Sequence, residues 1–177
     1  MIGIKKVLKW LDNLLIKFET IVLSWAIIVI SVMTFGNVVY RIITNRSWTF
    51  AQEVSEIAII MATFFGISYA ARYGRHISMS AFFDLAPMKI RKFLSIFNPF
   101  ITAIILFVLC YYAYEYMMHP LTQIRTTSSM EIPYSIMVIP IVLGFFLGGI
   151  QFLRNMWVNI KNEEVYLAQE RKDYDES

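Results

Sequence analysis

Four long runs of uncharged, mostly apolar residues divide the chain. They cover residues 20–40, 57–71, 93–114 and 132–153. A helix needs about 20 apolar residues to cross a bilayer core of about 30 Å, and the second run reaches that length if it starts near residue 50. We therefore predict transmembrane helices at 20–40, 50–72, 97–116 and 133–154.

The residues before the first run have a two-sided helical pattern. Apolar side chains recur at helical spacing from Ile4 to Phe18, with lysines on the opposite side. Such a helix suits the cytoplasmic membrane interface, where anionic headgroups attract lysine; packing against a partner protein is the alternative. We expect an N-terminal amphipathic interfacial helix at 4–18.

Two other segments are too polar to span a membrane. Residues 79–93 mix aromatic and basic side chains and predict an interfacial segment broken near Pro87. Asn98 and Pro99 then fit either the start of a new helix or a kink in one that began earlier. Residues 158–177 predict a helical extension that frays into a charged cytoplasmic tail.

Composition agrees with a membrane protein. Apolar residues make up 58% of the 177 residues, and the mean hydropathy is +0.57. A soluble domain of this size does not bury so much apolar surface. We expect residues 1–177 to form a single all-α integral membrane domain.

The basic residues predict which side each loop occupies. Of the 16 Lys and Arg residues, 13 fall in the N-terminal segment, the second loop and the C-terminal segment. Arg41, Arg46 and Arg125 lie in the two remaining loops. Because basic residues concentrate on the cytoplasmic side, both termini are predicted to be cytoplasmic. The three arginines then face the periplasm, either as docking residues for a partner or as ordinary interfacial anchors.

Small residues suggest where helices approach one another. They recur at every fourth position in the second span, and the fourth span carries two more; the set is Ala58, Ala62, Gly66, Ala70, Gly74, Gly144 and Gly148. Small side chains at this spacing allow close packing of helices in lipid. We expect these residues to serve subunit packing or assembly.

Ionisable residues flank the second span. Glu53 and Glu56 lie one turn apart near its start, where they either bind a cation or partner or favour the helix dipole. Arg72, Arg75 and His76 lie at its end. We expect these five residues, at the ends of the helix, to contact lipid headgroups or a partner.

The sequence gives no support for catalysis. His76 and His119 are predicted on opposite sides of the membrane, so they cannot share a haem iron. We found no sequence motif of a hydrolase, nucleotide-binding protein, metalloprotease or thiol redox protein. We expect no enzyme activity, cofactor, metal site or nucleic-acid partner; a membrane anchor of a redox complex remains the alternative.

The order of these features resembles the small membrane subunit of tripartite ATP-independent periplasmic (TRAP) transporters. The closest stretch is "FAQEVSEIAIIMATFFGISYAARYGRHISM", with an acidic start, a mid-helix glycine and an R-x-G-x-H-I exit. Gln52 stands where the family commonly has a second glutamate. A second stretch is "SSMEIPYSIMVIPIVLG".

The resemblance implies a subunit of a secondary, ion-coupled transporter in the bacterial inner membrane. Its partners would be a large elevator-type membrane subunit, a periplasmic substrate-binding protein and membrane lipids. The coupling ion would be sodium, and the substrate an organic acid such as a C4-dicarboxylate or sialic acid. The small subunit would be the fixed scaffold of the elevator.

Overall fold

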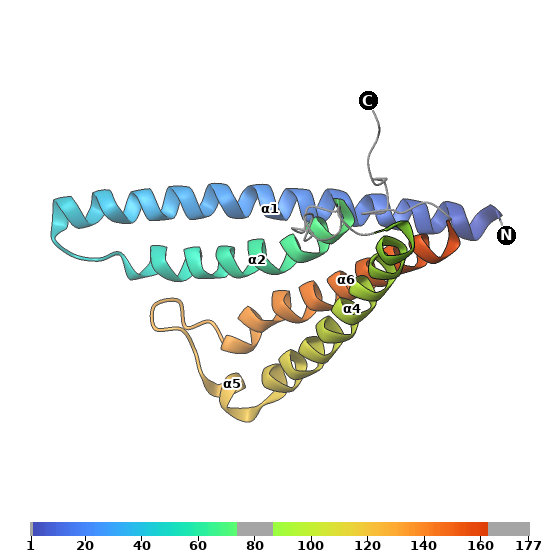
Figure 1. Ribbon diagram of the computed structural model, residues 1–177. Coiled ribbons are helices and arrows are strands. Elements are labelled where there is room, and N and C mark those ends of the chain that lie inside the picture. Colours follow the sequence, from blue (N-terminus) through green and yellow to red (C-terminus); the bar gives the residue numbers. More distant parts are fainter. Residues whose placement is uncertain (1, 74–86, 163–177) are drawn as a thin grey trace. The chain divides into compact units, whose positions relative to one another are not determined.

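The computed structural model describes residues 2–73 and 87–162 (Figure 1). The regular elements in these ranges are helices. In addition, one isolated β-bridge pairs Thr126 with Pro133. The helices are α1 (Ile2–Thr44), α2 (Thr49–Tyr73), α4 (Met88–Met118), α5 (Pro120–Ile124) and α6 (Tyr134–Lys161). The prediction of an all-helical chain is confirmed.

Four of the helices are long and apolar enough to cross a membrane. They run over Asp12–Thr44, Thr49–Tyr73, Met88–Met118 and Tyr134–Lys161. Between 6% and 33% of their most apolar windows is buried within the protein, so most of this apolar surface faces outward. Outward apolar surface is stable in lipid, whose hydrocarbon chains surround it without the cost of exposing it to water. The predicted number of long apolar helices is confirmed.

The helix boundaries differ in two places from the predicted segments. α1 passes from 4–18 into 20–40 without a break, so the amphipathic residues continue the first long helix. α4 begins directly after Pro87 and continues through Pro99, which selects a continuous helix over a new start at Asn98. Just after Pro99, the hydroxyl of Thr102 donates to the Asn98 carbonyl at 2.8 Å, a side-chain bond within the same helix.

Some predicted segments fall partly outside the described residues. Residues 79–86 of the expected interfacial segment and 163–177 of the expected tail lie there. The remaining part of the interfacial segment forms the first turns of α4, and the tail's first four residues complete α6. Placement of these parts at the membrane surface stays a prediction.

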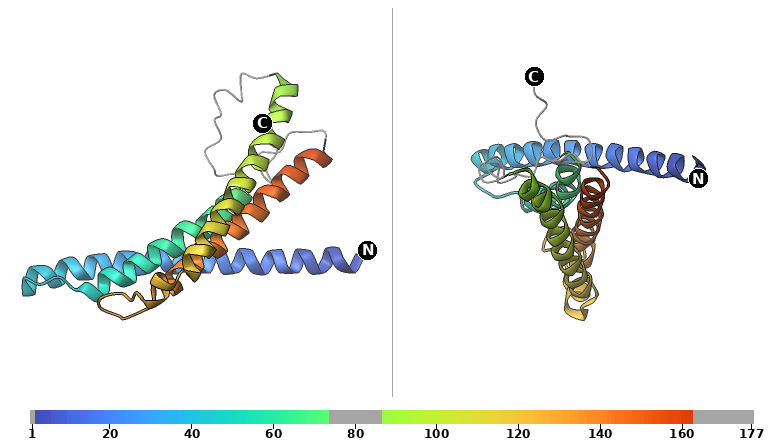
Figure 2. Two further views of the ribbon diagram at one scale, coloured as in Figure 1. Left: turned by 90° about the horizontal axis from the view of Figure 1, so that it is seen from below. Right: turned by 45° about the vertical axis from the view of Figure 1, so that its right-hand side comes forward.

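The chain folds into two compact units. Unit 1 comprises Met1–Gly66 and Tyr116–Ile141, and unit 2 comprises Ile67–Glu115 and Val142–Ser177. In unit 1, Phe65 of α2 is buried and meets the ring of Phe18 of α1 edge-on at 5.6 Å. In unit 2, α4 and α6 lie side by side (Figure 2), with Ala103 and Leu106 buried.

Candidate functional site

The loop between α5 and α6 has a defined conformation in unit 1. The backbone N–H of Tyr134 donates to the Arg125 carbonyl at 3.0 Å, and that of Thr127 donates to the Ile132 carbonyl at 2.9 Å. The buried hydroxyl of Thr127 also accepts from the Ile132 N–H at 3.1 Å. These bonds close residues 125–134 into a hairpin-like loop.

Glu53 fixes this loop to the start of α2. Its two carboxylate oxygens accept from the backbone N–H groups of Ser129 at 2.6 Å and Met130 at 2.9 Å. The hydroxyls of Thr49 and Ser129 lie 3.1 Å apart and form a further bond. Hydrogen bonds to an ionised carboxylate are shorter and stronger than neutral ones. Glu53 therefore acts as a clamp on the loop.

The turn between α1 and α2 lies at the same end of unit 1. The side-chain oxygen of Asn37 accepts from the Trp48 N–H at 2.8 Å. Asn45 has a φ of 52°, a left-handed conformation that asparagine adopts more readily than most residues. The rings of Tyr40 and Trp48 lie 5.9 Å apart. We call this turn and the loop 125–134 the polar end of unit 1.

The three arginines predicted to share one side of the membrane occur at this polar end. Arg41 is in the last turn of α1, Arg46 is in the turn before α2, and both are exposed. Arg125 is exposed at the base of the clamped loop, with its guanidinium 4.9 Å from the ring centre of Tyr134. The turn and the loop thus each carry exposed arginines, although they come from segments far apart in the sequence.

The small residues of α2 have varied surroundings. Ala58 is buried, whereas Ala62 and Ala70 are half-buried. A Cβ atom at Gly66 would lie 3.7 Å from the side chain of Leu23 of α1, an ordinary van der Waals distance. Gly66 therefore borders α1 but leaves room for a methyl group; Gly74 lies outside the described residues.

Two glycines of α6, Gly148 and Gly149, are packed more tightly. Gly144 is buried. A Cβ at Gly148 would lie 2.9 Å from a methyl of Ile67, and one at Gly149 would meet three ring atoms of Phe107 at 2.9–3.2 Å. At distances this short, an added side chain would force Ile67 or Phe107 to move. Gly149, which the four-residue spacing did not select, therefore lies directly against the ring of Phe107 of α4.

Unit 2 also buries several polar side chains that the sequence analysis did not single out. They are Ser68, Ser95, Gln151, Asn155 and Asn159, and Arg72 is buried with them at 4% exposure. The amide nitrogen of Asn155 donates to the backbone oxygen of Ala71 at 2.8 Å, near the end of α2 where helical carbonyls lack partners. A pattern in the sequence could have indicated them, because Gln151, Asn155 and Asn159 recur at every fourth position on one face of an apolar helix.

The other ionisable residues of the described ranges lie in different surroundings. Glu19, absent from the predicted set, is fully buried in α1, while Glu56 is exposed. His119 caps α5, and its ring nitrogen accepts from the Leu121 N–H at 3.3 Å. Within the described residues, no three His, Cys, Asp or Glu side chains lie close enough to hold a metal ion. Arg75 and His76 lie outside those residues.

Comparison with known proteins identifies a matching family and a similar protein. Residues 30–162 match the family described as tripartite ATP-independent periplasmic transporters, DctQ component. The chain is also 36% identical over 166 residues to the ectoine TRAP transporter small permease protein TeaB of Halomonas elongata. That similarity covers 94% of this chain and 86% of the relative.

Proposed function

Because the chain belongs to the DctQ component family of tripartite ATP-independent periplasmic transporters, we propose that this small permease subunit is a fixed scaffold for the large subunit. It is a transport protein and not an enzyme, and its family implies partnership with a large permease and a periplasmic binding protein. Because the chain belongs to this family, we no longer consider it the membrane anchor of a redox complex.

The observation that carries the scaffold role is the outward apolar surface of the four long helices. Their apolar windows are at most one-third buried within this chain. Such surfaces suit lipid or the helices of another subunit. The short contacts at Gly148 and Gly149 and the buried polar side chains favour a unit that keeps its shape. Solute uptake by the reconstituted transporter should therefore require this chain.

We propose that both termini are cytoplasmic in a bacterial inner membrane. The distribution of 13 basic residues on one side and three on the other supports this orientation. The polar end of unit 1, with Arg41, Arg46 and Arg125, then faces the periplasm. The amphipathic first turns of α1 lie at the cytoplasmic interface in the same arrangement.

We propose an organic acid as the solute and sodium as the coupling ion. The relative's name gives ectoine as its solute, and ectoine, C4-dicarboxylates and sialic acid share a carboxylate group. The binding protein and large subunit would select among them, since this chain supplies a scaffold. Uptake of each labelled solute by the complete transporter, with and without a sodium gradient, distinguishes these possibilities.

The polar end of unit 1 is our proposed docking surface for the binding protein. Arg125→Glu should weaken the apparent affinity of the transporter for its binding protein about tenfold, because one attraction becomes a repulsion. The measurement is uptake at increasing binding-protein concentration, with the effect shrinking at high salt.

Lys89→Glu is the matched control, because it makes the same charge change on the opposite predicted side of the membrane. It should leave the apparent affinity unchanged. Equal affinities for wild type and Arg125→Glu would mean that the arginines are interfacial anchors without a docking role.

A further inference from the structure

α1 leaves more of its membrane-spanning surface exposed than the other long helices. α2 covers one side of it: a Cβ at Gly66 would lie 3.7 Å from Leu23, and Phe65 meets Phe18 edge-on at 5.6 Å (Figure 1). Only 6% of the most apolar window of α1 is buried, the smallest share among the four long helices. Most of this helix therefore faces molecules outside the chain.

Exposed residues follow one another along α1 in alternate steps of three and four. They are Ile21, Ser24, Ile28, Ser31, Phe35, Val38 and Ile42, and we call them the outer seam of α1. The apolar members of the outer seam are 45–73% exposed. Two membrane helices that cross at about 20° meet along such a line of residues.

The two serines distinguish the outer seam from a surface that suits lipid alone. They lie one heptad apart between larger side chains, and small residues at this spacing let a second helix approach closely. The Ser31 hydroxyl donates to the Ile27 carbonyl at 2.9 Å, and its oxygen can still accept a hydrogen bond. Hydrocarbon chains offer no donor for that bond, whereas the side chains of another helix do.

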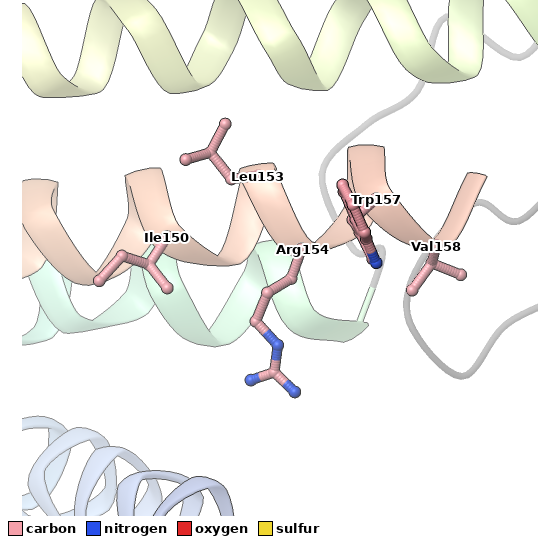
Figure 3. Close-up of a pocket in the computed structure, with 5 residues that line it drawn as sticks. All are labelled: Ile150, Leu153, Arg154, Trp157 and Val158. Carbon is pink, nitrogen blue, oxygen red and sulfur yellow. The ribbon is translucent and has the colours of Figure 1, made fainter. Parts of the chain in front are cut away.

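A groove on the last turns of α6 has a different composition (Figure 3). Its volume is about 280 Å³, and its lining residues all belong to α6: Ile150, Leu153, Arg154, Trp157 and Val158. An arginine and a tryptophan beside aliphatic side chains are typical of a helix at the headgroup level of a bilayer. Because none of these residues is small, the groove gives a second helix no close approach.

We propose that the outer seam of α1 packs against a membrane-spanning helix of the large subunit. This inference rests on the proposed scaffold function, and the family implies a large membrane partner. The outer seam is also continuous with the polar end of unit 1, because it ends at Ile42, next to Arg41 in the last turn of α1. The large subunit then adjoins the proposed docking surface, where one binding protein can contact both subunits.

The test measures the affinity of this chain for the large subunit in proteoliposomes, by energy transfer between dyes on the two subunits at increasing lipid content. Ser24→Leu and Ser31→Leu should each weaken binding about tenfold, because the larger side chain holds the partner helix away. Ser24→Ala and Ser31→Ala keep the space and lose only the hydroxyl. Each should weaken binding by less than about threefold.

Thr34→Leu is the matched control, because Thr34 is exposed on the same helix but outside the outer seam. It should leave the affinity unchanged. The free energy of unfolding of the isolated chain in micelles should be the same for Ser31→Leu and wild type, since Ser31 is exposed in this chain.

Wild-type affinity in both serine-to-leucine variants would mean that lipid covers the outer seam and would overturn the proposal. Equal weakening by Thr34→Leu and Ser31→Leu would overturn it too, as would a loss of folding stability in isolated Ser31→Leu. If the leucines reduced self-association of this chain and not its binding to the large subunit, a second copy would be the occupant. A wild-type chain that failed to bind the large subunit would instead contradict the scaffold function itself.

Discussion

Replacing Gly149 with alanine should destabilise unit 2, because the new methyl group would collide with the ring of Phe107. Three ring atoms lie 2.9–3.2 Å from the position of the added Cβ. Phe107 is itself packed against Phe146, with ring centres 6.2 Å apart, which restricts its movement. Overpacking of this kind typically costs about 1–3 kcal/mol.

Gly66→Ala is the matched control for this prediction. Both glycines are helical, so the general gain of alanine over glycine in a helix applies to both and cancels in the comparison. At Gly66 the added Cβ would lie 3.7 Å from Leu23, a distance that needs no adjustment. The measurement is the free energy of unfolding in mixed micelles.

Gly149→Ala should be less stable than Gly66→Ala by about 1–3 kcal/mol. Adding Phe107→Leu to Gly149→Ala should recover part of the loss, since the smaller side chain gives the methyl group room. Equal stability of the two alanine variants would show that the close approach of α6 to Phe107 does not constrain the fold.

Replacing Glu53 with glutamine should release the loop 125–134 while preserving side-chain size. The carboxylate accepts from two backbone N–H groups, whereas a carboxamide has one oxygen and an NH₂ group that would face a second donor. Hydrogen–deuterium exchange at the amides of Ser129 and Met130 should become about tenfold faster. The looser loop should also weaken the proposed docking of the binding protein.

Glu56→Gln provides the control, because Glu56 is one turn further along α2 and exposed. It removes the same charge from the same helix and should leave exchange in the loop unchanged. If Glu53→Gln also left the Ser129 and Met130 amides unaffected, the clamp would contribute nothing to the order of the loop.

The sequence predicted the long helices because their signal is local. A run of uncharged apolar residues of membrane-spanning length identifies a helix whatever surrounds it. Pro99 left two alternatives, since a proline can begin a helix or sit inside one, and the choice depends on whether nearby polar groups compensate for its missing donor. The structure shows α4 continuing through it.

Contacts between segments that are far apart in the chain were harder to predict from the sequence. Glu53 could be recognised as a candidate, but its partners Ser129 and Met130 lie 76 and 77 residues away, and no local pattern connects them. The spacing rule selected Gly148 and passed over Gly149, because closeness depends on which side chain faces the glycine. Asn155 could have been selected from the sequence, because polar residues recur at every fourth position in an otherwise apolar helix.

The scaffold role is tested most directly by measuring solute uptake into proteoliposomes with and without this chain. All samples contain the large subunit, the binding protein and a sodium gradient, with equal amounts of large subunit in the membrane. We expect uptake only when this chain is present, and reduced uptake with Gly149→Ala in proportion to its lost folded fraction. Full uptake by the large subunit and binding protein alone would contradict the scaffold role.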